Sequence, residues 1–133
     1  MNKIIHDIIK LKETHNLMEE DATQDKQYLW YHFALNNGLV ETYYDNTKLL
    51  GFFEYVRLDK IPKSFDDLPN CSSDFVSGKI VFVSNAISNC YKTMLKFREV
   101  LFKKNQDALC FVWHNKKNDT MKVFKNVRYG KIL

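Results

Sequence analysis

One carboxylate lies where it could accept a proton in a reaction. Glu54 is the single charged residue of the apolar run 51–56. If its strand face is buried, burial raises the pKa of the carboxyl group and lets it act as a general base near neutral pH. Strand alternation puts Glu54 on the face of Phe52 and Val56, opposite Phe53 and Tyr55. We expect that face to be partly open to solvent, with catalysis as the alternative.

Two of the four histidines lie beside aromatic residues at positions that could carry function. His32 shares a helical face with Tyr28 and Leu29, which favours a buried or half-buried structural histidine over a catalytic one. His114 ends a strand-like run beside Trp113, and strand ends are frequent places for binding and catalysis. A functional role and a purely structural role both stay open for these residues.

Motifs of high specificity for phosphate, metal or a serine nucleophile are absent from the sequence. The three cysteines, Cys71, Cys90 and Cys110, are odd in number, and no two stand at metal-ligand spacing. Free thiols are typical of a reducing compartment, so we expect a cytoplasmic protein without a metal. No apolar run reaches the roughly 18 residues of a membrane span, and charge interrupts segment 1–7 where a signal peptide would be apolar.

Composition predicts one folded domain over residues 1–133. Aromatic residues make up 14% of the chain, which argues against disorder. The net charge of +4 is mild, and the aromatic residues fall at core spacing on helices and strands. Nucleic acid is therefore not signalled as a partner.

The candidate residues must be positioned by elements that the spacing of apolar residues predicts. Helical intervals predict helices over residues 3–15, 22–36 and 89–104. Aromatic and β-branched runs predict strands over residues 39–44, 49–58, 79–83, 108–114 and 120–124. Turn-forming residues 45–48 join the first two strands as a hairpin, and residues 59–78 form a long loop.

The predicted order is α-α-β-β-β-α-β-β, which indicates an α+β fold. Two N-terminal helices precede a mostly antiparallel sheet with one inserted helix. The strand–helix–strand unit over residues 79–114 forms the one parallel crossover, which should be right-handed.

This order resembles the core of the GNAT superfamily of acyl-CoA-dependent N-acyltransferases. Within the superfamily it is most similar to the toxin-activating lysine acyltransferases and to small GNAT-like proteins of phage genomes. The resemblance covers about residues 22–132 and rests on residues 28–32, 49–55, 77–85, 111–117, 122–124 and 130–132.

The resemblance implies a site between the strand of residues 79–83 and the strand of residues 108–114. In the family the first of these strands is central, and its end diverges from its neighbour to admit the pantetheine arm of the acyl donor. Amides at the start of the next helix bind the diphosphate, because unpaired N–H groups and the helix dipole attract an anion. Acetyl-CoA or another acyl-CoA is thus the implied cosubstrate, and an amine the implied acceptor.

The residues that would carry this chemistry fall into three groups. The catalytic candidates are Glu54 or His32 as base, with Ser84 at the strand end. The implied cofactor-binding residues are Asn85, Ser88, Asn89 and Cys90, and the further candidates are Trp113 and His114.

A non-enzymatic interpretation stands beside the acyltransferase. Residues 84–92 contain no glycine, unlike the family's glycine turn, and Ser84 stands where the toxin-activating enzymes carry Asp. Both features favour a phage or mobile-element accessory protein with a degenerate GNAT fold. Such a protein would bind a host or viral protein in the host cytoplasm, through loop 59–78 and exposed aromatic residues. A homodimer is a further arrangement that the sequence leaves open.

Overall fold

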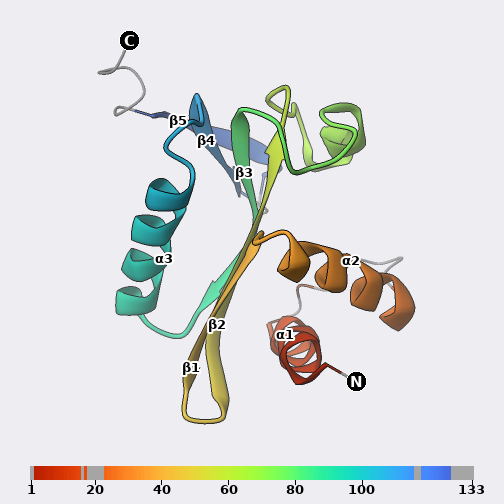
Figure 1. Ribbon diagram of the computed structural model, residues 1–133, viewed down its shortest axis with the longest axis vertical. Coiled ribbons are helices and arrows are strands. Elements are labelled where there is room, and N and C mark those ends of the chain that lie inside the picture. Colours follow the sequence, from red (N-terminus) through yellow and green to blue (C-terminus); the bar gives the residue numbers. More distant parts are fainter. Residues whose placement is uncertain (1, 16, 18–22, 116–117, 127–133) are drawn as a thin grey trace.

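The computed structural model describes residues 2–15, 17, 23–115 and 118–126. They form an α+β fold with a five-stranded mixed sheet (Figure 1). The elements, in chain order, are α1 (Lys3–Thr14), α2 (Gln24–Asn36), β1 (Val40–Asp45), β2 (Lys48–Leu58), η1 (Phe65–Asn70), β3 (Ile80–Ser88), α3 (Tyr91–Lys104), β4 (Cys110–Asn115) and β5 (Thr120–Lys125). The predicted order of helices and strands is confirmed, and the short 3-10 helix η1 is an addition within the long loop.

The strands lie side by side in chain order, β1-β2-β3-β4-β5. Neighbouring strands are antiparallel except β3 and β4, which are parallel and are connected through α3. The predicted single parallel crossover is therefore confirmed.

Helices cover both faces of the sheet, with α3 on one face and α1, α2 and η1 on the other (Figure 1). Phe97 of α3 stacks on Phe53 of β2, with 4.0 Å between the ring centroids. Tyr31 of α2 meets Phe52 edge-on from the other side, at 6.2 Å. Because successive residues of β2 point to opposite faces, both of its side-chain rows are buried from Gly51 to Leu58.

β3 extends beyond the predicted strand over residues 79–83 and ends only at Ser88. The polar residues from Ser84 onward are typical of a strand end, but β2 continues beside them and pairs as far as Gly51↔Ser88. Tertiary pairing thus overrides local propensity here. As a consequence, α3 begins at Tyr91 rather than at Asn89.

A buried arginine connects three segments at the end of the sheet where β3 and β4 begin. Arg57 donates from Nε to the Gly78 carbonyl at 2.6 Å and from Nη1 to Asn105 Oδ1 at 2.8 Å. Its guanidinium also contacts both oxygens of Asp107, at 3.2 and 3.1 Å. This clamp, defined as Arg57 with Gly78, Asn105 and Asp107, joins β2 to the segments that precede β3 and β4.

The clamp predicts a specific loss of stability in acid. Hydrogen bonding by Arg57, and to a smaller extent by Lys79, lowers the pKa of Asp107 from 3.8 to about 2. A carboxyl group whose pKa is lower in the folded than in the unfolded chain stabilises the fold above pH 4, and that contribution disappears as the pH falls toward 2. We expect Asp107→Asn to lower the free energy of unfolding at pH 7, and the difference from wild type to shrink between pH 4 and pH 2.

Urea denaturation at several pH values measures this difference. Asp59→Asn serves as the control, because the Asp59 side chain makes no hydrogen bond or ion pair within the described chain. An Asp107→Asn deficit that stays constant down to pH 2 would contradict the assignment.

Candidate functional site

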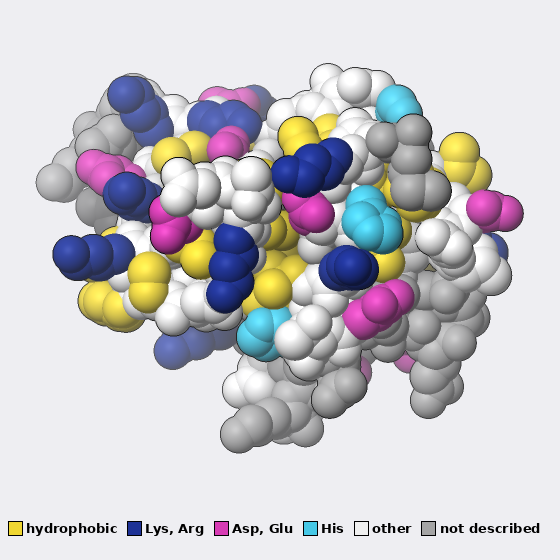
Figure 2. All heavy atoms as spheres, turned by 90° about the horizontal axis from the view of Figure 1, so that it is seen from below, with side chains coloured by type: hydrophobic (Ala, Val, Ile, Leu, Met, Phe, Trp, Pro, Cys, Tyr) yellow, Lys and Arg dark blue, Asp and Glu magenta, His cyan; other side chains and the backbone are white. Residues whose placement is uncertain are grey.

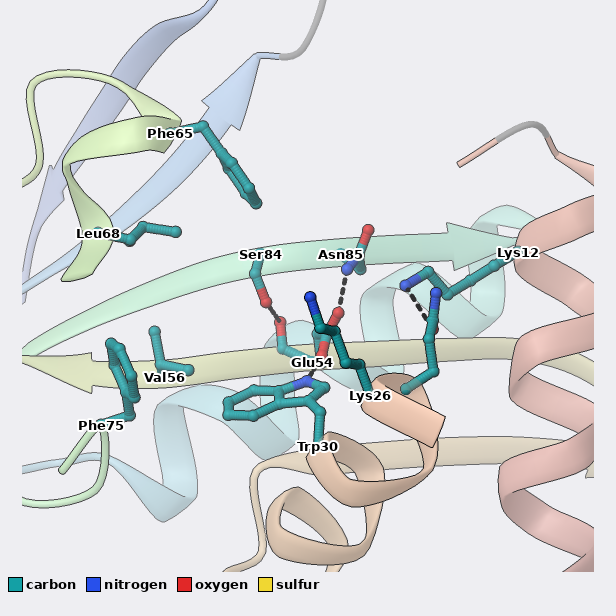
Figure 3. Close-up of a pocket in the computed structure, with 11 residues that line it drawn as sticks. Lys12, Lys26, Trp30, Glu54, Val56, Phe65, Leu68, Phe75, Ser84 and Asn85 are labelled. Carbon is teal, nitrogen blue, oxygen red and sulfur yellow. Dashed lines mark hydrogen bonds between the residues drawn. The ribbon is translucent and has the colours of Figure 1, made fainter. Parts of the chain in front are cut away.

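A pocket of about 320 Å³ lies between α2, η1 and the sheet, with Glu54 near its centre (Figure 3). One wall is apolar and comes from α2, β2, η1 and the loop after η1, while the other residues are polar. The lining residues are Trp30, Val56, Phe65, Leu68 and Phe75 on the apolar side, and Lys12, Lys26, Gln27, Glu54, Ser84 and Asn85 on the polar side.

Glu54 is only 2% exposed, so the expectation of a partly solvent-open face is wrong. The reason is that α2 packs over this face of β2 and brings two donors with it. Trp30 Nε1 donates to Oε2 at 2.7 Å, and the Tyr31 hydroxyl donates to Oε1 at 3.3 Å. Asn85 Nδ2 donates to Oε1 from β3. A carboxylate has about four acceptor positions, so these three donors leave room for one hydrogen from a ligand.

An irregularity in β3 brings two of the candidate residues to Glu54. The pairing runs from Glu54↔Asn85 directly to Tyr55↔Val83, so Ser84 is an extra residue in β3. Such a bulge bends the strand and redirects its side chains. The Ser84 hydroxyl donates to the Glu54 carbonyl oxygen at 3.4 Å, while the Asn85 amide reaches the carboxylate. The structure therefore brings together Glu54 and Ser84, two of the catalytic candidates, and Asn85, one of the implied cofactor-binding residues.

The strands β3 and β4 pair over only part of their length. Their parallel ladder ends at Val83↔Trp113, whereas β3 continues to Ser88 with β2 as its partner. A hollow of about 280 Å³ lies at this divergence, and Ser84 lines both the hollow and the Glu54 pocket. The residues around the hollow are Leu17, Val83, Ser84, Ala86, Met94, Trp113 and His114.

Within the described residues, the divergence leaves one edge of β3 without a neighbouring strand beyond Val83. From Ser84 to Ser88, the backbone groups of β3 that point toward β4 have no ladder partner in β4. Unpaired N–H and C=O groups along a strand edge can hydrogen-bond an extended ligand, as in peptide recognition by strand addition. The hollow can therefore hold a narrow chain that lies along β3.

His114 forms a pair that the sequence analysis did not anticipate. Its Nε2 lies 2.7 Å from Asp119 Oδ1, and its side chain is 7% exposed. The contact with His114 lowers the pKa of Asp119, which favours Nε2–H as the donor. Nδ1 is buried and has no hydrogen-bond partner within the described chain. The ring packs against Phe65 at 5.2 Å and borders the hollow.

The structure separates His32 from the other candidates. α2 turns Gln27, Tyr31 and Ala34 toward the protein, at helical spacing, and His32 is exposed. One residue corresponds to about 100° around a helix, so His32 points away from the face that Tyr31 buries. The expectation of a buried or half-buried His32 is wrong, and His32 does not line the Glu54 pocket.

The two amides just before α3, those of Asn89 and Cys90, are not free to bind the implied diphosphate. The Asn89 amide donates to the Leu50 carbonyl at 3.1 Å, and the Cys90 amide donates to Ser88 Oγ at 3.2 Å. Amides already bound within the chain cannot also cradle an anion. The hollow at the divergence of β3 and β4 can hold a narrow ligand, whereas the Asn89 and Cys90 amides are not available for the implied diphosphate.

Several residues that line the pocket were not among the catalytic or cofactor-binding candidates of the sequence analysis. Phe65 and Phe75 belong to the loop 59–78, where two aromatic residues among Ser, Asp and Pro were the available signal. Trp30 and Tyr31 were noted only as part of a predicted helix and of the segment 28–32 that carries the resemblance. Asp119 reaches His114 because the β4–β5 hairpin returns, with Asn115 paired to Thr120.

Within the described residues, no group of three or more His, Cys, Asp or Glu side chains is arranged to hold a metal ion. None of the helices in this part of the chain is both long and apolar enough to cross a membrane. On the face seen in Figure 2, basic and acidic side chains are interspersed, with hydrophobic side chains between them.

Comparison of the chain with protein-family models, with curated proteins and with solved structures found no match.

The cysteines differ enough in environment to predict an order of reactivity. Cys90 is exposed at the start of α3, and the hydrogen bond with Thr93 Oγ1, 3.1 Å away, is the first cause of its lowered pKa. Burial raises the pKa of Cys71 and of Cys110. Because the thiolate is the reactive form, we expect iodoacetamide to modify Cys90 at least about tenfold faster than the other two.

Peptide mass spectrometry after brief alkylation of the folded protein measures these rates. Thr93→Val keeps the shape of the side chain but removes its hydroxyl, and should slow the modification of Cys90. Equal rates at all three cysteines in the folded protein would contradict the assignment.

Proposed function

We propose that the protein is an N-acyltransferase that moves an acyl group from an acyl thioester, such as acetyl-CoA, to an amine. The observation that carries this proposal is the early end of the β3–β4 ladder at Val83↔Trp113, beside a pocket with a buried carboxylate. The activity is the one that the resemblance to the GNAT superfamily implies.

The donor supplies an acyl carbonyl activated by its bond to sulfur. Its narrow arm would lie in the hollow, held by the backbone groups of β3 between Ser84 and Ser88. Because Ser84 lines both cavities, the acyl carbon would arrive at the boundary between the hollow and the Glu54 pocket. The protein thereby supplies proximity, which is the largest contribution to such a transfer.

The acceptor amine would occupy the Glu54 pocket. Trp30, Phe65 and Phe75 offer apolar walls to its body, while Glu54 accepts a hydrogen bond from its nitrogen. When the nitrogen attacks the carbonyl carbon, the C–S bond breaks and the amine loses one proton. Glu54 takes that proton, and the leaving sulfur acquires one from solvent or from an acid nearby.

A non-enzymatic function is the second candidate, and one feature of α2 favours it. Leu29 is 74% exposed and Phe33 is 37% exposed, one helical turn apart on the same face of α2. Exposed apolar residues grouped in this way are typical of protein contact surfaces. In this alternative the protein acts by binding another protein, and Leu29→Asp, at an exposed residue that does not line the Glu54 pocket, abolishes that binding.

Acetyl-CoA binding and acetyl transfer to arylalkylamines test the first proposal. Glu54→Gln keeps the size of the side chain but removes the base, so turnover should fall by about 10²–10⁴-fold while the Kd for acetyl-CoA stays unchanged. Ala86→Phe fills the hollow without touching the Glu54 pocket, so it should abolish acetyl-CoA binding. Isothermal titration measures the Kd, and mass spectrometry of the amine measures turnover.

His32→Ala and Ala86→Ser are the matched controls, because the first removes an exposed side chain and the second barely changes the volume of the hollow. Both should behave as wild type. Absence of heat with millimolar acetyl-CoA, together with no acetylated amine, would contradict the proposal. Equal turnover by Glu54→Gln and wild type would exclude Glu54 as the base.

A further inference from the structure

The largest described cavity lies on the other face of the sheet from the Glu54 pocket. It measures about 690 Å³ and forms a groove between α3 and β5, over β4. α3 contributes one row of side chains, and β4 and β5 provide the floor and the second wall. The groove residues are Met94, Arg98, Phe102, Phe111, Trp113, His114, Asn115, Lys122, Phe124 and Lys125.

The strand register explains the aromatic floor of this groove. Phe111 pairs with Phe124, and Trp113 pairs with Lys122, so these four side chains share one face of the β4–β5 hairpin. The Trp113 and Phe124 rings meet edge-on at 6.3 Å. α3 does not cover this part of the sheet completely, and Phe124 is exposed.

The charge of the groove has one sign. Arg98, Lys122 and Lys125 line it, and no acidic side chain does. Within the described chain none of the three cations forms an ion pair, and the one contact that Lys122 Nζ makes is with the Phe124 ring, at 5.5 Å. Three cations beside the exposed Phe124 ring and the half-buried Trp113 ring match a ligand that combines phosphate groups with a planar ring.

The groove is continuous with the hollow between β3 and β4. Met94, Trp113 and His114 line both cavities. A ligand seated in the groove could therefore extend a narrow arm past Trp113 into the hollow. The amides of Asn89 and Cys90 are not available to the phosphates of such a ligand, since they are already hydrogen-bonded within the chain.

We propose that this groove binds the adenine nucleotide end of the acyl donor, an inference that rests on the proposed function. The base stacks against Trp113 and Phe124, and Arg98, Lys122 and Lys125 bind the phosphates. The volume of the groove lies within the range of about 300–1,000 Å³ that is typical of small-ligand pockets. The donor thus enters from the α3 face and ends at Ser84, and the acceptor approaches from the α2 face.

The two tryptophans of the chain report separately on the two cavities. Trp30 lines the Glu54 pocket and Trp113 lines the groove, so Trp30→Phe leaves Trp113 as the sole indole reporter. The probe is adenosine 3′,5′-bisphosphate, which carries the base and phosphates without the arm. We expect saturable quenching of Trp113 fluorescence, and weaker binding of adenosine or pyrophosphate alone. Isothermal titration of the wild-type protein checks the same affinity without a substitution.

Charge reversal separates binding in the groove from general attraction to a basic protein. Lys122→Glu should weaken bisphosphate binding by about tenfold or more, because it places a carboxylate among the phosphates. Lys96→Glu makes the same change in net charge on an exposed residue of α3 that does not line the groove, and should change the Kd less than about twofold. Equal weakening by both substitutions would overturn the proposal.

The remaining outcomes distinguish this inference from the proposed function. Bisphosphate binding in the groove without any acetyl transfer supports the inference and counts against the acyltransferase. Acetyl transfer with an unchanged acetyl-CoA Kd in Lys122→Glu supports the acyltransferase and overturns the inference. Lack of saturable quenching at millimolar bisphosphate also overturns it. So does self-association of the protein that Lys122→Glu abolishes, because the groove would then be occupied by a second copy.

Discussion

The buried carboxylate of Glu54 is the constraint on which this arrangement depends. A charged group removed from water is costly unless hydrogen bonds replace its hydration, and removing one of its partners is strongly destabilising. Trp30 and Tyr31 supply those bonds from α2, and Asn85 supplies one from β3. The requirement therefore holds α2 against the sheet at one rotation about its axis, and it selects the bulge at Ser84. Trp30 in the wall of the pocket and the Glu54 carboxylate at its centre therefore belong to one hydrogen-bond network.

The divergence of β3 from β4 is possible because β3 has a second partner strand, β2, over its full length. β2 pairs with β3 as far as Ser88, so β3 needs no support from β4 beyond Val83. At the opposite end, the Arg57 clamp joins the segments that lead into both strands. The two strands are thus held together where they begin and released where they end. An opening with one anchored end can stay at a defined width without a ligand to support it, which suits a preformed binding site.

The order of elements could be predicted from the sequence because it depends on local periodicity, which the apolar residues display clearly. The burial of Glu54 could not, because strand alternation identifies two faces without saying which helix will cover each. The exposure of His32 could not be predicted for a similar reason. It depends on the rotation of α2 about its axis, which the contacts of Trp30 and Tyr31 with Glu54 decide. Ser84 and Asn85 were recognised as polar groups near a strand end, but their roles in a bulge required the partner strand. Asp119 lies next to His114 only because the β4–β5 hairpin folds back on itself.

The cavities of the site approach the sheet from opposite faces, and this limits what the protein can do with them. The Glu54 pocket lies on the α2 face and the basic groove on the α3 face, and the sheet separates them except where β3 and β4 diverge. Reactants bound in the two cavities can meet only at that opening, which Ser84 and His114 border. The His114 ring borders this opening, and its Nε2 is held by Asp119. In the proposed transfer, Glu54 on the α2 side of this opening is the group that takes the amine proton, and the leaving sulfur acquires its proton from solvent or from an acid nearby.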